Sequence, residues 1–132
     1  MPSGQAMADW RAECLNAGRY DLLVAEYAFP LAVYLPGQPP LRATPRLVRE
    51  FFQSFHVALA SGGFDRLTAR VTAEALPFGG RRRLWTDWIG AGRSRAPALV
   101  AQTVCYSRST GGRCRTEMLE FTRLDLPVLA AA

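Results

Sequence analysis

The stretch DRLTARVTAEAL (residues 65–76) alternates cleanly between apolar and polar side chains. One face carries five apolar residues, Leu67, Ala69, Val71, Ala73 and Ala75. The other face carries arginine, threonine and glutamate. An alternation with a period of two predicts a β-strand with one face in the core and the other toward solvent.

Three more strand-like stretches follow this one. They are RRRLWTDWIGAG (81–92), ALVAQTVCYSR (98–108) and CRTEMLEFTRL (114–124). The connecting segments PFGG, SRAP and STGG have the residues typical of turns. Four consecutive strands joined by short turns predict an antiparallel, strongly curved meander that the preceding helices cover.

The best-marked helix lies just before the strands, in TPRLVREFFQSFHVAL (44–59). Thr44 is the expected N-cap, Pro45 suits the first helical position, and Gly62 with Gly63 ends the helix. Its apolar residues recur at spacings of three and four and form a face wide enough to pack on a sheet. That face consists of Leu47, Val48, Phe51, Phe52, Phe55, Ala58 and Leu59.

Two shorter helices are expected nearer the N-terminus. The first lies in QAMADWRAECLNAG (5–18) and ends near residue 16, with Met7, Trp10 and Cys14 on one face. The second is YDLLVAEY (20–27), which ends before the next proline. These helices supply the layer that covers the sheet.

Between the second and third helices, FPLAVYL (29–35) alternates like a strand. Its Pro30 is tolerable near the start of an edge strand, because proline cannot donate a hydrogen bond to a neighbour. LRA (41–43) can return beside it as a short hairpin partner. The whole pattern predicts an α+β fold.

The length of 132 residues predicts one domain, 1–132, with an ordered core from about 7 to 126. No run approaches the roughly 18 uninterrupted apolar residues of a membrane helix. The first ten residues have neither the basic nor the apolar segment of a secretory signal. We therefore expect a cytoplasmic location and no membrane partner.

The formal net charge is +5, and all 16 basic residues are arginine. Arginine suits phosphate, but only residues 81–83 form a run and no ribonucleoprotein motif accompanies them, so we expect no nucleic-acid partner. Cys14, Cys105 and Cys114 show no paired spacing and lie far in sequence from His56, the only histidine. We expect free thiols, no metal and no cofactor; a glycine-rich phosphate loop is also lacking.

Taken in order, these elements resemble the nuclear transport factor two-like superfamily, also called SnoaL-like, over about residues 7–126. The resemblance rests on YDLLVAEYAFPLAVYL, on the capped helix TPRLVREFFQSFHVAL, and on the closing strand GGRCRTEMLEFTRL. It implies a cone-shaped, cystatin-like α+β barrel, in which a curved sheet wraps around the helices and leaves a hydrophobic cup. Some family members are isomerases, cyclases, dehydratases or hydrolases that use the cup as an active site. Others serve as binding and dimerisation modules. None of their catalytic constellations can be carried over residue by residue.

The register of the first long hairpin decides where Asp87 lies. If the PFGG loop is even, Trp88 points into the cup and Asp87 points out beside Trp85. Asp87 is then a cross-strand partner of Arg70 or Arg83. An odd loop or a bulge reverses this assignment and makes Asp87 a catalytic candidate within the cup.

The same reasoning at the STGG turn places Gln102, Tyr106 and Glu117 on the more apolar, inner face. A carboxylate on the wall of an apolar cup would hold its proton tightly and could act as general acid or base, with Gln102 and Tyr106 orienting a carbonyl or hydroxyl group. The alternative is that Glu117 pairs with an arginine near the mouth. His56, at the margin of the helix face, is either a structural residue or a third catalytic candidate.

These placements lead to three hypotheses. In the first, the protein binds a small hydrophobic or carbonyl-bearing molecule in a cup whose aromatic lining is Trp10, Tyr27, Phe52, Phe55 and Trp88. In the second, it is an isomerase, cyclase or dehydratase that moves a proton with Glu117, Asp87 or His56. In the third, it is an assembly module. Trp85 and Ile89 on the outer sheet face favour a homodimer, because tryptophan and arginine are enriched at interfaces.

Overall fold

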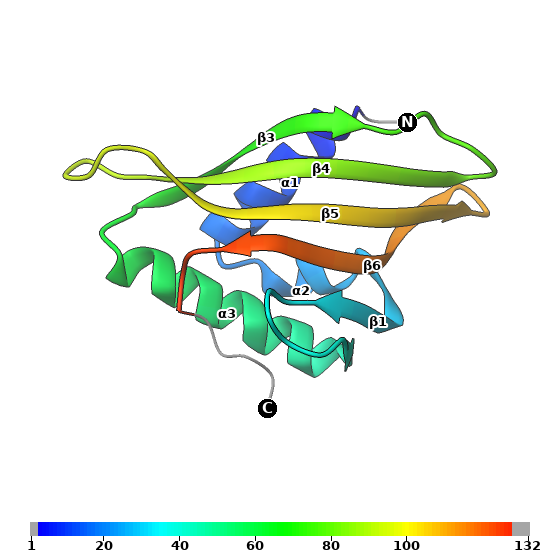
Figure 1. Ribbon diagram of the computed structural model, residues 1–132, viewed down its shortest axis with the longest axis horizontal. Helices are drawn as coiled ribbons and strands as arrows, with labels where there is room; N and C mark the ends of the chain where they lie inside the picture. Colours follow the sequence, from blue (N-terminus) through cyan, green and yellow to red (C-terminus); the bar gives the residue numbers. More distant parts are fainter. Residues whose placement is uncertain (1–2, 128–132) are drawn as a thin grey trace.

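The computed structural model describes residues 3–127 and has one layer of helices against one sheet (Figure 1). The helices are α1 (Gly4–Asn16), α2 (Tyr20–Val24) and α3 (Pro45–Ser61). The strands are β1 (Tyr27–Tyr34), β2 (Leu41–Ala43), β3 (Arg66–Glu74), β4 (Arg81–Ala91), β5 (Ala98–Thr110) and β6 (Arg113–Leu124). No helix within residues 3–127 is long and apolar enough to cross a membrane.

The six strands form one open sheet in the order β2-β1-β6-β5-β4-β3. The consecutive strands β3 to β6 pair antiparallel, as the sequence predicted, and β2 pairs antiparallel with β1. The pair β1–β6 is parallel, so the sheet is mixed rather than wholly antiparallel, and it does not close into a barrel. In Figure 1 α1 and α2 lie behind the sheet and α3 lies below it, so the face toward the viewer is uncovered. We call the face with the helices the inner face and the uncovered face the outer face. The α+β prediction is confirmed.

The prediction that residues 29–35 form an edge strand was wrong. Strand β1 lies between β2 and β6. Its register with β6 shifts between Tyr27 and Ala32, the interval that contains Pro30. A proline without an N–H is therefore accommodated at an irregularity, another position that prolines occupy in sheets. Tyr27, expected to end the second helix, is instead the first residue of β1.

Helix α3 begins and packs as the sequence predicted. The Thr44 hydroxyl accepts a hydrogen bond from the Leu47 amide at 3.2 Å, and Pro45 is the first helical residue. Val48, Phe55, Ala58 and Leu59 are buried against the sheet, and three further apolar residues, Leu47, Phe51 and Phe52, pack partly buried beside them. This helix places its aromatic side chains on the inner side of the sheet.

Helix α1 packs only in part on the face predicted. Cys14 is buried as expected, but the other buried residues include Ala8, Ala12 and Leu15, and Trp10 is 38% exposed. The alanines recur four residues apart, and their small side chains allow the helix to lie close against β3, its main neighbour in the sheet. Arg11 belongs to this buried face and is only 6% exposed.

A bulge in β6 sets the direction of the side chains that follow it. Ser107 pairs with Thr116, but Tyr106 pairs with Met118, so Glu117 is the extra residue. One extra residue exchanges the two faces of the positions that follow it, here as far as a second extra residue at Thr122. As a result Leu119 and Phe121 lie opposite Cys105 and Thr103 rather than beside Tyr106.

Candidate ligand-binding cup

A cavity lies between the inner sheet face and the helices. Thirteen side chains surround it: Arg11, Leu15, Leu23, Tyr27, Phe51, Phe52, Phe55, Leu67, Trp88, Thr103, Cys105, Leu119 and Phe121. They come from all three helices and from strands β1, β3, β4, β5 and β6. The cavity volume is about 50 Å³. We call this cavity the cup.

Aromatic rings form most of one wall of the cup. The Phe51 ring centroid is 5.3 Å from that of Phe121 and 6.3 Å from that of Phe55, while Phe52 lies 6.0 Å from Tyr27. Phe51 and Phe52 are only partly buried. The cup therefore has a buried inner end and a more exposed end at Phe51 and Phe52.

The cup has few polar groups. The indole Nε1 of Trp88 donates to the Thr103 hydroxyl at 2.8 Å, so the indole is held by a partner on the neighbouring strand. Tyr27 and Cys105 are both buried. Burial raises the pKa of the Tyr27 phenol and of the Cys105 thiol above their ordinary values, so both groups are neutral near pH 7.

Arg11 is the charged residue of the cup, and the sequence analysis did not single it out. Its Nε donates to a carboxylate oxygen of Glu26 at 2.7 Å. Its Nη1 faces the Cys105 sulfur at 3.6 Å, and its Nη2 faces the Thr116 hydroxyl at 3.4 Å. Glu26 is 23% exposed and does not belong to the lining, so the positive charge faces the cup and the negative charge lies behind it.

One signal in the sequence could have identified Arg11. Ala8, Ala12 and Leu15 are spaced by four and three residues, which places them on one face of a helix. Arg11 lies three residues after Ala8 and therefore on the same face. A face of small residues marks close packing, and an arginine within such a face is expected to be buried.

The raised pKa values of the Cys105 thiol and the Tyr27 phenol predict a loss of stability in alkali. Their ordinary pKa values are 9.0 and 10.0. Above these pH values the unfolded chain loses protons that the folded protein keeps, so the free energy of unfolding falls as the pH rises. Each group contributes a slope of about 1.4 kcal/mol per pH unit. Urea unfolding at a series of pH values measures the slope. Tyr27→Phe should reduce it above pH 10; a slope equal to that of the natural protein would contradict the assignment.

The structure places four of the predicted aromatic residues around the cup and one away from it. Tyr27, Phe52, Phe55 and Trp88 are part of the lining. The expectation for Trp10 was wrong, because the buried face of α1 is the alanine face and Trp10 lies outside it.

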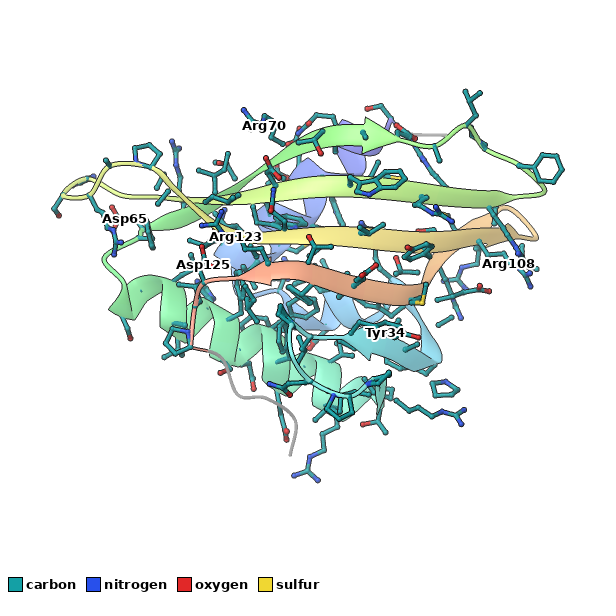
Figure 2. The ribbon with its side chains drawn as sticks, viewed as in Figure 1. Tyr34, Asp65, Arg70, Arg108, Arg123 and Asp125 are labelled. Atoms are coloured by element: carbon teal, nitrogen blue, oxygen red, sulfur yellow. The ribbon has the colours of Figure 1, made fainter. Side chains whose placement is uncertain are left out.

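Asp87 lies on the outer face, as the even register predicted. It pairs with Arg70 of β3 in the register, and its carboxylate accepts from the Arg70 guanidinium at 3.0 Å. Its other oxygen accepts from the Gln102 amide at 2.8 Å. Gln102 is its direct partner on β5, so Gln102 also faces outward, contrary to prediction. Figure 2 shows Arg70 at the β3 edge of the sheet.

Glu117 and Tyr106 also lie outside the cup, so their predicted inward direction was wrong. Glu117 is exposed, and its carboxylate is 3.5 Å from the guanidinium of Arg108, labelled near the β5–β6 hairpin in Figure 2. The Tyr106 hydroxyl donates to Glu120 at 3.5 Å. The physical reason is the bulge at Glu117, since an unbulged hairpin would have placed Leu119 and Phe121 on the face of Tyr106.

His56 faces α2 rather than the cup. Its Nδ1 lies 2.6 Å from the Tyr20 hydroxyl, and the two rings meet edge to face with centroids 6.0 Å apart. None of the described residues that line the cup is a histidine or a carboxylate. Within residues 3–127, no three histidine, cysteine, aspartate or glutamate side chains gather as a metal site requires.

A second hollow lies over the outer face, with a volume of about 620 Å³. A row of paired residues crosses its floor: Ala32, Met118, Tyr106 and Arg83. The Arg83 guanidinium lies 4.8 Å from the ring centroid of Tyr106 and 5.7 Å from that of Trp85. Leu76 and Phe78, in the β3–β4 loop, also line the hollow and are 91% and 87% exposed.

An open curved sheet with helices on one face and a cup between them is the architecture of nuclear transport factor two-like proteins with a cystatin-like fold. A nuclear transport factor two-like protein with this fold from Novosphingobium aromaticivorans is 11% identical, with a TM-score of 0.64 over 89% of this chain and 77% of that chain. A candidate calcium/calmodulin-dependent protein kinase type II association domain from Thiobacillus denitrificans is 19% identical, with a TM-score of 0.66 over 89% and 90%. A candidate scytalone dehydratase from Novosphingobium aromaticivorans is 9% identical, with a TM-score of 0.63 over 92% and 82%.

These similarities establish the fold and leave the activity open, because one fold hosts many functions. Neither the protein-family models nor the curated protein sequences gave a match.

Proposed function

We propose that the protein binds a small apolar or carbonyl-bearing molecule in the cup. The observation that carries this proposal is the combination of an aromatic wall with a few convergent polar groups, namely Arg11, Tyr27 and Thr103. Ligand sites have this composition, with apolar surface for affinity and a few polar groups for orientation.

The size of the cup limits the ligand. A volume of about 50 Å³ exceeds the roughly 10–15 Å³ needed for one water and is below the roughly 150 Å³ of a cavity that accepts benzene. A narrow aliphatic chain suits this space better than a ring. A ligand of six or more non-hydrogen atoms, whether a ring or a five-carbon chain, would require the half-buried Phe51 and Phe52 to turn aside.

Acid–base catalysis is not part of the proposal. Glu117, Asp87 and His56, the three catalytic candidates of the sequence, all lie outside the cup and have partners of their own. A general base must be within about 3.2 Å of the proton that it removes, or one water away. A substrate in the cup is out of reach of these groups.

The tryptophan indoles provide the test. Each indole N–H gives a separate nuclear magnetic resonance signal, and Trp88 lines the cup while Trp10 lies outside it. Titration with pentanamide, a short neutral carbonyl compound, should shift the Trp88 signal until it saturates and leave the Trp10 signal in place. An unmoved Trp88 signal, or equal drift of both signals, would contradict binding in the cup.

Two variants at one position give the matched control. Cys105→Met adds volume to the wall of the cup and should abolish the saturable shift. Cys105→Ala removes volume at the same position and should retain it. If both variants behave alike, the shift does not arise from occupancy of the cup.

The outer face favours a second function, association with another copy of the chain. Trp85 and Ile89 are partly buried on this face beside Asp87. Two strongly exposed apolar side chains, Leu76 and Phe78, lie at the hollow. Exposed apolar patches next to a hollow are typical of interaction sites. The structural neighbour described as an association domain is consistent with this role.

A further inference from the structure

Arg11 has two donor groups without strong acceptors. Its Nε is taken by the Glu26 carboxylate at 2.7 Å, but its Nη1 and Nη2 face only a thiol at 3.6 Å and a hydroxyl at 3.4 Å. An N–H···O bond is normally 2.7–3.2 Å long. The hydroxyl contact is longer than that, and a thiol is a weak acceptor. Cys105 belongs to the lining of the cup and Thr116 does not, so a carboxylate entering the cup would replace the thiol as acceptor for Nη1 and compete with the hydroxyl for Nη2.

The charges around Arg11 also favour an anion. Burial raises the pKa of the Cys105 thiol, which therefore remains uncharged beside the guanidinium near pH 7. Glu26 neutralises the charge of Arg11 but is not part of the lining of the cup. Arg11 is the only charged side chain among the described residues of the lining. An anionic group in the cup would thus meet a positive charge in surroundings where water screens it poorly.

The shape of the guanidinium further restricts the chemical class of the anion. Nη1 and Nη2 present parallel N–H groups that fit the two oxygens of a carboxylate side by side. Beyond them the cup is lined by leucine and phenylalanine, which suit a hydrocarbon chain. The small volume leaves room for only a short chain behind the carboxylate.

The geometry points to a short-chain aliphatic monocarboxylate as the occupant of the cup, with its carboxylate on Nη1 and Nη2 of Arg11 and its chain against the aromatic wall. This inference rests on the proposed function, because it names the ligand class of the same cup. It goes beyond that proposal in requiring a negative charge on the ligand and in assigning the recognition of that charge to Arg11.

Pentanoate and pentanamide provide the test, because they differ chiefly in charge. Calorimetric titration at pH 7 should show pentanoate binding at least about tenfold more tightly than pentanamide, since hydrogen bonds to charged groups are the stronger ones. Both compounds should shift the Trp88 indole signal. The double variant Arg11→Met with Glu26→Gln should lose the preference for pentanoate, so that the two compounds bind with equal affinity.

The double variant removes the ion pair as a unit, so neither partner is left uncompensated in the folded protein. Arg70→Met is the matched control, because Arg70 lies on the outer face with a 68% exposed side chain. It should leave the preference intact.

The possible outcomes distinguish the carboxylate inference from the broader proposal that the cup binds a small molecule. Equal affinities for the two compounds, with Trp88 shifted by both, would overturn the carboxylate inference and leave the cup as a site for neutral ligands. A preference for pentanoate that survives in the double variant would overturn the role of Arg11. Failure of both compounds to shift Trp88 would overturn the binding proposal and this inference together.

Discussion

Glu26→Gln is expected to lower the free energy of unfolding by about 3 kcal/mol, because it leaves a buried positive charge without a counter-charge. Arg11 is 6% exposed, and its guanidinium stays protonated at any accessible pH. Within residues 3–127 its one ion-pair partner is Glu26. A glutamine can still accept a hydrogen bond from Nε, but it carries no charge to offset the burial of the guanidinium.

Arg11→Met is expected to cost less, about 1–2 kcal/mol. It leaves a carboxylate that is 23% exposed and can therefore be hydrated in place of the lost ion pair. The double variant should return to within about 1 kcal/mol of the natural protein, because an ion pair replaced as a unit leaves nothing uncompensated. This order of stabilities follows from the unequal burial of the two partners.

Urea unfolding of the four proteins, followed by circular dichroism, measures these differences. The double-mutant cycle then gives the coupling between Arg11 and Glu26. If the two single variants lose equal stability, or if Arg11→Met is the less stable of the two, the buried guanidinium is not the group that Glu26 stabilises. Glu50→Gln is the control, since Glu50 pairs with Arg46 on the exposed surface of α3 and its loss should change stability by less than about 0.5 kcal/mol.

The sequence predicted the elements of the fold well because their signals are local. Thr44 and Pro45 define the start of α3 by their own chemistry, and the alternation in residues 65–76 gives β3 directly. The register of the first hairpin was also predicted correctly, since Asp87 pairs with Arg70 and Trp88 lines the cup. No such local signal predicts that β1 pairs parallel with β6, which joins residues nearly 90 positions apart.

The candidate site was predicted less well, and one residue accounts for most of the error. The extra residue at Glu117 exchanges the two faces of β6, and nothing in EMLEFT distinguishes a bulged from a regular strand. The distribution of apolar residues between the two faces of β5 also led to a wrong prediction of which face is the inner one. Its inner face carries small residues such as Ala101, Thr103 and Cys105, because the space above them is filled by large side chains from α3 and β6. The more apolar face was therefore not the inner one.

Arg11 was not predicted as a residue of the site for a different reason. Arginine is normally assigned to solvent, and its burial here depends on Glu26, which lies 15 residues away in the segment between α2 and β1. A pairing of this kind is visible only when the fold has brought the two side chains together. The partner of Arg11 is thus the feature of the cup that the sequence could not predict, although the proposed ligand preference rests on Arg11.

Phe78→Asp is expected to dissociate the proposed homodimer. The Phe78 side chain is 87% exposed in a loop that borders the outer hollow, so in a symmetric dimer the ring of one protomer can enter the hollow of its partner. A central aromatic anchor contributes at least about 2 kcal/mol to an interface, which corresponds to a roughly 30-fold increase in the dimer dissociation constant. Trp85→Arg should act in the same direction, because it adds a charge to the outer face beside Arg83.

Sedimentation of the natural protein and of each variant over a range of concentrations measures this constant. Val57→Asp is the control, since Val57 is also apolar and 66% exposed but lies on α3, in the helical layer. It should leave the dimer intact, and Phe78→Asp should not alter the affinity of the cup for its ligand. If the natural protein is monomeric throughout, or if Val57→Asp weakens association as much as Phe78→Asp does, then the outer hollow is not the interface. In that case the exposed Phe78 and Leu76 would have to be explained by a partner other than a second copy of this chain.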